Sequence, residues 1–466
     1  MADDVEELRG LLPFLEDIES IETFRHFGHT MSTRTMIKGL YEVEAGTILT
    51  LREEPEPAAY VSLSPPERVF QDQESYSRHL RSGIEAVTTR LLMSVGARQL
   101  VVPISAGYDS RLILTALRQA GATNVITYSY GVSGSPQKEI SQRVAEALGY
   151  PFHFVEYDVK RVRSAWNETE EKEYLRKAWG ATSLPFRQDW FAIRELTRRG
   201  VVGEGAVVLP GHSIPIALAP EAAFTDEPLS AADVGNDIAR AIGNIQGKPK
   251  RAASSRRFRE GLALAARETG FGSENQDALR LWQWFNLKTR QAKFISNSVR
   301  VYEHFGLQWA LLLHEPEIWD ARLAGSKELL RDRAGYKEFV DRFYGEIAGE
   351  STPTALRTTV PEPTARRSRP KPAFVSAIGR SAITRNAVRR VGALKRDLSP
   401  PRSSFALEAF REDRSRLGTF VDSMQGVRGN GLTVSLFLKD ARRVVPPLFE
   451  SRGWVSLRRF APRSQR

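Results

Sequence analysis

Ser105, Gly107, Asp109 and Ser110 stand within one short stretch of polar and small residues, Ser-Ala-Gly-Tyr-Asp-Ser. Two hydroxyls can donate hydrogen bonds to an anion, and a glycine lets the backbone approach a ligand closely or adopt a positive φ. A carboxylate repels a phosphate, but it can hold one through a bridging Mg²⁺ ion. The pattern therefore indicates a magnesium–phosphate site. The alternative for Asp109 is an ordinary helix N-cap.

A buried strand and a helix must position this stretch. Residues Leu100–Ile104 form a short, β-branched apolar run, which is typical of a strand buried in a parallel sheet. After Arg111 the apolar residues recur at helical spacing, which predicts a helix over 111–120 that starts near Asp109 or Ser110. The start of such a helix carries unpaired N–H groups and the positive end of the helix dipole, and both favour an anion.

Strands and helices alternate along the chain on both sides of this loop. In chain order we expect a helix over Glu74–Val95, strand 100–104, helix 111–120, a strand over Val125–Tyr130, a helix over Glu139–Leu148, a strand over Phe152–Val155, a helical stretch over Asn167–Arg199 and a strand over Ala206–Leu209. This alternation predicts an α/β fold with a doubly wound parallel sheet. Ligands bind such sheets at the carboxyl ends of the strands, where we expect Ser105, Tyr130 and Pro210 to meet.

The composition narrows the classes of chemistry. The 466 residues contain no cysteine, which excludes disulfides, thiolate metal sites and thiol nucleophiles. The seven histidines lack metal-ligand spacing, so we expect no zinc site. No segment has the length of a membrane helix, and the acidic N-terminus lacks the basic start and apolar centre of a signal peptide. We therefore expect a cytoplasmic protein without a membrane partner.

The net charge of +11 is concentrated in one segment. Between Leu356 and Arg402 there are twelve Lys or Arg residues and two Asp or Glu residues, a net charge of +10. The rest of the chain is nearly neutral, which argues against a nucleic-acid partner for the main body. Residues 352–404 are rich in Pro, Ser, Thr and Arg, so we expect most of them to be mobile.

Three further segments carry structural expectations. Leucines at helical spacing predict a surface helix within residues 1–22. The Pro- and Glu-rich residues 54–66 are interpreted as a linker. The charged residues 244–259 are interpreted as a linker or an exposed loop, because a run of charges usually marks a solvated surface.

Several stretches, in the same order, resemble one protein family. Ser105–Ser110 resembles the S-G-G-x-D-S pyrophosphate loop of the PP-loop ATP pyrophosphatases, and the chain after it resembles the synthetase domain of asparagine synthetases. The later matches are a strand and adenine-side loop at 125–136, a helix and strand at 139–153, a nucleotide-binding strand and turn at 207–213, and a substrate-side helix at 290–303. The resemblance implies a sheet of the PP-loop (adenine nucleotide alpha hydrolase-like) type with a helical C-terminal lobe.

The resemblance also implies a domain organisation. Residues 34–46 resemble the end of the family's glutaminase domain, so residues 1–66 are interpreted as a remnant of that domain and a linker. Residues 67–345 would form the ATP-binding domain, 346–404 a basic, Pro- and Arg-rich mobile segment, and 405–466 a C-terminal helical segment. The family's glutaminase uses an N-terminal cysteine as nucleophile. This chain has no cysteine and cannot hydrolyse glutamine by that mechanism.

The activity that the resemblance implies is ATP-dependent amide formation. ATP adenylates a carboxylate and releases pyrophosphate, and an amine then attacks the acyl-adenylate and releases AMP. The chain would be an asparagine synthase-like carbon–nitrogen ligase, or amidotransferase, with ATP and Mg²⁺ as cofactors. Its substrate would be a small-molecule carboxylate, and its nitrogen would come from ammonia, an amine or a separate glutaminase partner.

The family's site residues carry over to matching positions of this chain. Asp109 would bind magnesium and serve in catalysis, and His212 would act as acid, base or phosphate donor. The pyrophosphate and magnesium would contact Ser105, Ala106, Gly107, Asp109 and Ser110. The adenosine would contact Ile104, Tyr130, Pro210 and Gly211, largely through the backbone. The alternative for Ile104 and Tyr130 is that they are plain core residues.

Three positions depart from the family's pattern. Ala106 replaces a loop glycine, which alanine can do where φ is negative. His212 replaces a glutamate that supports the adenylate step, and a structural turn histidine is the alternative. Pro215 replaces the second metal-binding aspartate, and its side chain cannot bind a metal. Lys293 and Glu303 are weaker candidates for the acceptor side, with a solvated helix pair as the alternative.

Two other functions stay open from the sequence. One is a PP-loop enzyme that acts on tRNA, in which residues 356–402 would hold the phosphates. The lack of cysteine for sulfur chemistry argues against it. The other is a catalytically weakened, nucleotide-binding member of the family with a regulatory or scaffold role, which Pro215 supports.

Overall fold

The computed structural model describes residues 2, 4–8, 11–51, 56–60, 66–166, 169–212, 219, 221–224, 228–272, 277–349, 434, 437 and 438. The strands are β1 (Thr47–Thr50), β2 (Glu56–Ala59), β3 (Leu100–Pro103), β4 (Val125–Gly131), β5 (Phe152–Glu156), β6 (Val207–Val208) and β7 (Gln308–Trp309). The helices up to the middle of the chain are α1 (Ile18–Phe27), α2 (Gln73–Val95), α3 (Tyr108–Gln119), α4 (Pro136–Ala147), α5 (Val159–Trp166), α6 (Thr169–Trp179) and α7 (Trp190–Arg198). The later helices are α8 (Ala231–Ala241), α9 (Pro249–Ser254), α10 (Arg256–Glu268), α11 (Ala278–Asn286), α12 (Arg300–His304), α13 (Pro316–Leu323), α14 (Lys327–Leu330) and α15 (Ala334–Ala348).

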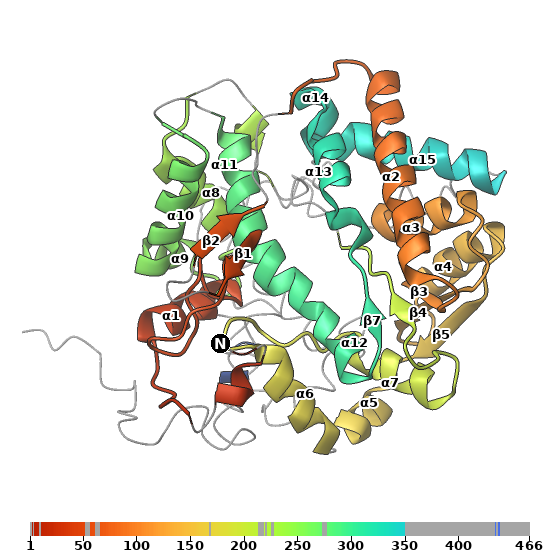
Figure 1. The fold of residues 1–466 in the computed structure, drawn as a ribbon, viewed down its shortest axis with the longest axis horizontal. Helices are drawn as coiled ribbons and strands as arrows, with labels where there is room; N and C mark the ends of the chain where they lie inside the picture. The colour runs from red at the N-terminus through yellow and green to blue at the C-terminus, as the bar shows by residue number, and fades with distance from the viewer. Residues whose placement is uncertain are drawn as a thin grey trace, which may run out of the picture.

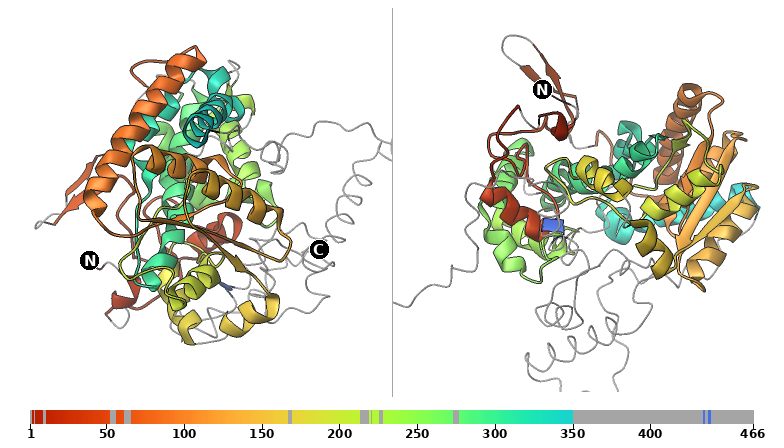
Figure 2. Two further views of the ribbon diagram at one scale, coloured as in Figure 1. Left: turned by 90° about the vertical axis from the view of Figure 1, so that its right-hand side faces the viewer. Right: turned by 90° about the horizontal axis from the view of Figure 1, so that it is seen from below.

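A parallel sheet of five strands carries the predicted Ser105–Ser110 loop at one edge, where its strands end. The strand order is β5-β4-β3-β6-β7, and every neighbouring pair is parallel. The predicted α/β class with a parallel sheet is confirmed. β3 is the central strand (Figures 1 and 2). From β3 the chain first adds β4 and β5 on one side, and later it returns to add β6 and β7 on the other side. The carboxyl ends of β3 and β6 therefore flank the switch point of the sheet.

Successive side chains of the central strand β3 are buried in two different cores, one on each face of the sheet. Leu100 and Val102 of β3 point into a cluster with α2, α3, α4 and α15, whereas Val101 points into a cluster with α5, α6, α7 and α12. Successive residues of a strand face opposite sides of the sheet, so helices cover both of its faces. This is why the strand residues form apolar runs with little polar alternation.

The structure also contains a helical lobe beside the sheet. Its core includes Phe27 of α1, Val234 of α8, Phe258 of α10 and Trp282 of α11. In Figure 1 this lobe lies at the side of the molecule opposite α3 and α4. Among the described residues, this lobe therefore combines α8, α10 and α11 from the middle of the chain with α1 from near its start.

The predicted helix within residues 1–22 is wrong in position. A short 3₁₀ turn covers Val5–Leu8, and the helix α1 begins only at Ile18. Pro13 lacks a backbone N–H, which disfavours a continuous helix across it. The Asp17 side chain accepts a hydrogen bond from the Ser20 backbone N at 3.0 Å and caps α1.

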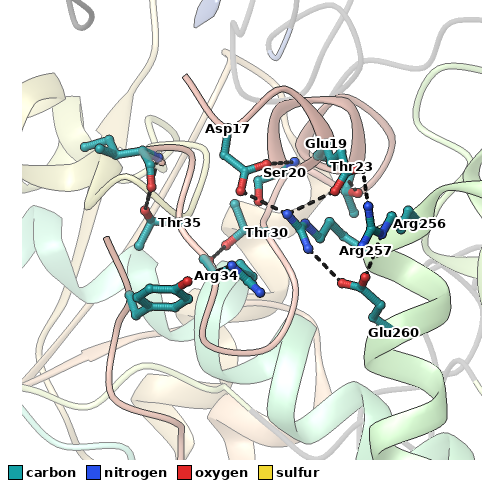
Figure 3. Close-up of polar contacts among 12 residues, drawn as sticks. Asp17, Glu19, Ser20, Thr23, Thr30, Arg34, Thr35, Arg256, Arg257 and Glu260 are labelled. Atoms are coloured by element: carbon teal, nitrogen blue, oxygen red, sulfur yellow. Dashed lines mark hydrogen bonds and ion pairs between the residues drawn. The ribbon is translucent and has the colours of Figure 1, made fainter. Parts of the chain in front are cut away.

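Two segments that the sequence indicated as linkers contain regular structure. Within 54–66, strand β2 pairs antiparallel with β1, although residues 54, 55 and 61–65 lie outside the described residues. Residues 244–259 contain α9 and the start of α10. Arg257 of α10 is largely buried and pairs with Asp17 at 3.2 Å and Glu19 at 3.0 Å, which ties α10 to the start of α1 (Figure 3). Arg257 therefore lies in an interface between α1 and α10, whereas the neighbouring Arg256 stays exposed.

The C-terminal predictions fall almost wholly outside the described residues. The predicted mobile segment 346–404 is described only up to Gly349, where α15 has ended, and 405–466 only at Val434, Phe437 and Leu438. Val434 and Phe437 are buried in a cluster with Phe24 of α1. Among the described residues, no helix is long and apolar enough to cross a membrane.

Candidate functional site

A pocket lies where the carboxyl ends of β3 and β6 meet. Its volume is about 200 Å³. It is lined by Pro103, Ser105, Gly107, Asp109, Ser110, Tyr130, Phe186, Asp189, Pro210, Gly211, His212 and Tyr302. The structure thus brings together all the predicted site residues except Ile104 and Ala106. Those two are buried behind the loop, and the Ile104 carbonyl accepts a hydrogen bond from Ser141 Oγ at 3.3 Å.

The loop between β3 and α3 is held by its own hydroxyls. The Ser105 backbone N donates to Ser110 Oγ at 3.2 Å, and the Gly107 backbone N donates to Ser105 Oγ at 3.2 Å. Gly107 is the N-cap residue of α3, with φ −79° and ψ 166°, so it does not use a positive φ. Ala106 does not have a positive φ. An alanine can therefore occupy this loop position, where the resembled family has glycine.

Asp109 is not the helix N-cap, because α3 begins at Tyr108 and its cap makes no side-chain hydrogen bond. Its carboxylate instead accepts a hydrogen bond from the Tyr336 hydroxyl of α15 at 2.7 Å. Arg322 Nη1 lies 3.8 Å from Oδ1, and Arg333 Nη1 lies 3.5 Å from Oδ2. The N-cap interpretation of Asp109 is therefore wrong, and three groups from the later part of the chain hold its carboxylate.

Gly211 permits a close approach between the two halves of the pocket. A Cβ atom at this position would lie 3.0 Å from the Ser110 backbone N and 3.3 Å from Ser110 Cα and Cβ. The turn after β6 can therefore rest against the first turn of α3 only because residue 211 has no side chain. The loop and the turn form one surface.

His212 is a neutral imidazole with one ring nitrogen available. Its Nε2 lies 2.9 Å from Ser298 Oγ, and that hydroxyl donates to the Ile295 carbonyl at 2.8 Å. Since Ser298 has one proton, Nε2 must be the donor to Ser298, and Nδ1 carries the lone pair. Nδ1 has no hydrogen-bond partner among the described residues. Burial, and then the nearby His314, lowers the pKa of His212 to about 3.

A buried carboxyl surrounded by tyrosines forms another wall of the pocket. Asp189 Oδ2 accepts hydrogen bonds from Tyr302 at 2.8 Å and from Tyr128 at 3.4 Å, and Tyr130 also bonds to this carboxyl. Burial raises the pKa of Asp189, although the tyrosine hydroxyls act in the opposite direction. Tyr130 also accepts a hydrogen bond from Gln188 Nε2 at 3.0 Å. Tyr130 is therefore both a pocket residue and part of this polar cluster.

Sequence reasoning did not identify Asp189. It directly precedes α7, where an aspartate ordinarily acts as an N-cap, but its side chain makes no capping hydrogen bond. The sequence does contain one indication of this cluster. Tyr128 and Tyr130 lie two residues apart in β4, so both hydroxyls lie on one face of the sheet and can bond to the same buried carboxyl.

The weaker candidates lie outside the pocket lining. Lys293 is buried and bonds to Glu42 and to Thr30 Oγ1, the latter at 3.1 Å. Glu303 is partly exposed on α12 and pairs with Arg300 at 2.8 Å, as a solvated helix pair would. Pro215 lies outside the described residues.

The donors around Asp109 do not fit a resident magnesium ion. Mg²⁺ needs oxygen ligands at about 2.0–2.1 Å in octahedral geometry. Both carboxylate oxygens of Asp109 face positive or donor groups, from Arg322, Arg333 and Tyr336. Within the described part of the chain there is no cluster of three or more His, Asp or Glu residues that could hold a metal ion.

Comparison with protein-family models finds no model that matches the chain, and comparison with curated proteins finds no match either.

Proposed function

We propose that the protein is an ATP-dependent amide-forming ligase of the asparagine synthetase type, with a sheet of the PP-loop kind. The observation that carries the proposal is the pocket at the switch point, where the Ser105–Ser110 loop and the Pro210–His212 turn share one surface. Sheets of this kind bind ligands there. The first turn of α3 adds backbone N–H groups and the helix dipole, which suit a phosphate.

The residues divide into two groups by their place in the pocket. Ser105, Gly107, Asp109 and Ser110 surround the start of α3, which suits the pyrophosphate part of ATP. Tyr130, Pro210 and Gly211 line the pocket from β4 and from the turn after β6, which suits the adenosine. Ile104 and Ala106 support the loop from behind and are not expected to contact the nucleotide through their side chains.

In the proposed reaction a carboxylate oxygen of the substrate attacks the α-phosphorus of ATP. The bond to the β-phosphate oxygen breaks, and pyrophosphate leaves. An amine then attacks the acyl carbon of the adenylate, AMP leaves with the electron pair of the broken C–O bond, and the nitrogen loses a proton. His212 lines the pocket, and we infer that its Nδ1 lone pair accepts a hydrogen bond from that amine and orients it, while the proton passes to solvent. A neutral imidazole suits this role, and it argues against His212 as a cationic phosphate donor.

The nitrogen source of the proposed ligase is ammonia, an amine or a separate glutaminase. The chain contains no cysteine that could serve as glutaminase nucleophile. Asp189 and its tyrosines make one wall of the pocket polar, which favours a substrate that carries hydrogen-bonding groups besides its carboxylate. We infer that the alternative of a PP-loop enzyme acting on tRNA is weaker, since the chain has no cysteine for sulfur chemistry.

A second candidate is a nucleotide-binding protein that turns ATP over slowly or not at all. The observation that favours it is the charge balance at Asp109, where two arginines and a tyrosine hold the carboxylate expected to bind magnesium. The two candidates share nucleotide binding and differ in pyrophosphate release.

The test is ATP–pyrophosphate exchange in the presence of a panel of amino-acid and uronic carboxylates, with and without ammonia. The ligase predicts carboxylate-dependent exchange. Asp109→Asn should lower it at least hundredfold, or about 2.7 kcal/mol, because the neutral amide no longer holds Arg333 and the Tyr336 hydroxyl beside the loop. Asp158→Asn is the matched control, because Asp158 is also an aspartate at a helix start but lies outside the pocket. ATP binding without exchange for any carboxylate would favour the second candidate, and absence of ATP binding would refute both.

His212→Asn separates the two half-reactions. We expect the variant to keep carboxylate-dependent exchange and to lose amide formation by about a hundredfold, because the attacking amine is no longer oriented by the imidazole. Equal loss of both activities would contradict the role assigned to His212. Urea unfolding of the variant controls for loss of the Ser298 hydrogen bond.

A further inference from the structure

Two arginines reach the phosphate loop from the later part of the chain. Arg322 is the penultimate residue of α13, and its side chain is 1% exposed. Its guanidinium lies 3.9 Å from the centre of the Tyr336 ring, and Nη1 and Nη2 have no hydrogen-bond partner among the described residues. Burying charged N–H groups without hydrogen bonds is unfavourable, and the groups that offset the charge of Arg322 here are the Asp109 carboxylate, 3.8 Å from Nη1, and the face of the Tyr336 ring.

Arg333 is held beside Asp109 by an uncommon backbone. Asp332 has φ 52° and Arg333 has φ 58°, two successive left-handed residues of which neither is glycine. Such residues are strained and persist only where the surroundings hold them, often at functional sites. Arg333 directly precedes α15, and the turn directs its Nη1 to a point 3.5 Å from Asp109 Oδ2 in α3.

The charges around the loop leave a net positive site without a metal. One carboxylate faces two guanidiniums, which is a net charge of +1 for the three groups. The two nearby histidines add no charge near neutral pH, because burial lowers the pKa of His212 to about 3 and that of His314 to about 4. A Mg²⁺ ion at Asp109 would stand a few ångströms from both arginines and be repelled by them.

We propose that Arg322 and Arg333 take the place of magnesium at the loop, so that the pocket binds the pyrophosphate group of a nucleotide without a bound metal ion. The proposal rests on the proposed function, since it concerns the same phosphate subsite. The arginines offset the repulsion between Asp109 and the phosphates, which is what a bridging metal would otherwise do. The backbone N–H groups at the start of α3 supply the hydrogen bonds.

The test is isothermal titration of the full chain with inorganic pyrophosphate and with ATP, once in EDTA and once in excess Mg²⁺. We expect both ligands to bind in EDTA, with dissociation constants within threefold of those in Mg²⁺. Binding that appears only with Mg²⁺ would overturn the metal-free site and leave the proposed function standing. Absence of binding under both conditions would overturn both.

Arg333→Gln tests the role of the arginines directly. Its side chain is 14% exposed, so the substitution is less disruptive than one at Arg322. We expect pyrophosphate binding in EDTA to weaken at least tenfold and to recover in part when Mg²⁺ is added, because an Asp109 oxygen is then free for the metal. Arg342→Gln is the control, an exposed arginine of α15 that pairs with Glu338. Unchanged binding in EDTA by a folded Arg333→Gln variant would overturn the proposal.

Discussion

Gly211→Ala tests the close approach of the turn after β6 to the loop before α3. The added Cβ would lie 3.0 Å from the Ser110 backbone N, whereas carbon atoms pack best at about 3.5–4.0 Å from their neighbours. The two segments must therefore separate by a few tenths of an ångström. Ser110 cannot move alone, because it lies in the first turn of α3 and is buried.

The size of the effect follows from this overlap. Overpacking a close-packed site costs about 1–3 kcal/mol. Replacement of glycine by alanine also restricts the unfolded chain, which stabilises the fold by about 0.4–1 kcal/mol. We therefore expect a net loss of about 1–2 kcal/mol in the free energy of unfolding. Because the same shift displaces the turn from the loop, we expect ATP affinity to fall about tenfold.

Urea unfolding and titration with ATP measure the two effects. Gly203→Ala is the matched control, since a Cβ there would meet only Gln99 Oε1, at an ordinary 3.7 Å. The control should change stability by no more than about 0.5 kcal/mol. If Gly211→Ala unfolds at the parental urea concentration and binds ATP as tightly as the parent, the contact between turn and loop is not a constraint and the reasoning fails.

Two further predictions concern stability. Burial lowers the pKa of His29 from its ordinary 6.5 to about 3 in the folded protein. As the pH falls from 6.5 towards 3, the unfolded chain takes up a proton that the folded protein does not, so the free energy of unfolding falls by up to about 1.4 kcal/mol per pH unit. His29→Gln should reduce the dependence of the free energy of unfolding on pH, measured by urea unfolding at pH 7, 6 and 5. An unchanged dependence would contradict the lowered pKa of His29. Arg257→Ala should destabilise by about 1–3 kcal/mol because it leaves Asp17 without its cationic partner, whereas Arg256→Ala, whose side chain is 64% exposed, should cost less than about 1 kcal/mol in the same assay. Equal effects of the two substitutions would show that the buried pair is not the stronger one.

Local patterns in the sequence predicted the elements around the loop well. The predicted strand 100–104 and helix 111–120 correspond to β3 and α3, and the predicted helix Glu74–Val95 corresponds to α2. These elements have apolar residues at the spacing that their own geometry requires, so a short window of sequence contains the information.

Charged residues were harder to place, because their partners lie far away in the chain. The sequence predicts that Asp109 binds a metal, but the carboxylate is bonded to Tyr336, 227 positions later. The sequence predicts that Arg257 lies in a solvated run of charges, but it pairs with Asp17, 240 positions earlier. Such long-range pairs leave no periodic pattern in the sequence. A single sequence therefore predicts whether a charged side chain is exposed less well than it predicts whether an apolar side chain is buried.

The long separation between Asp109 and Tyr336 has a consequence for how the chain is made. Ribosomes add about 5–20 residues per second, so roughly 11–45 s pass between synthesis of the loop and synthesis of α15. During that interval β3, β4 and β5 can already pair, whereas the carboxylate of Asp109 still lacks its arginines and its tyrosine. The nascent protein therefore passes through a stage in which these three strands have been made and the carboxylate of Asp109 has none of the partners that offset its charge in the folded protein.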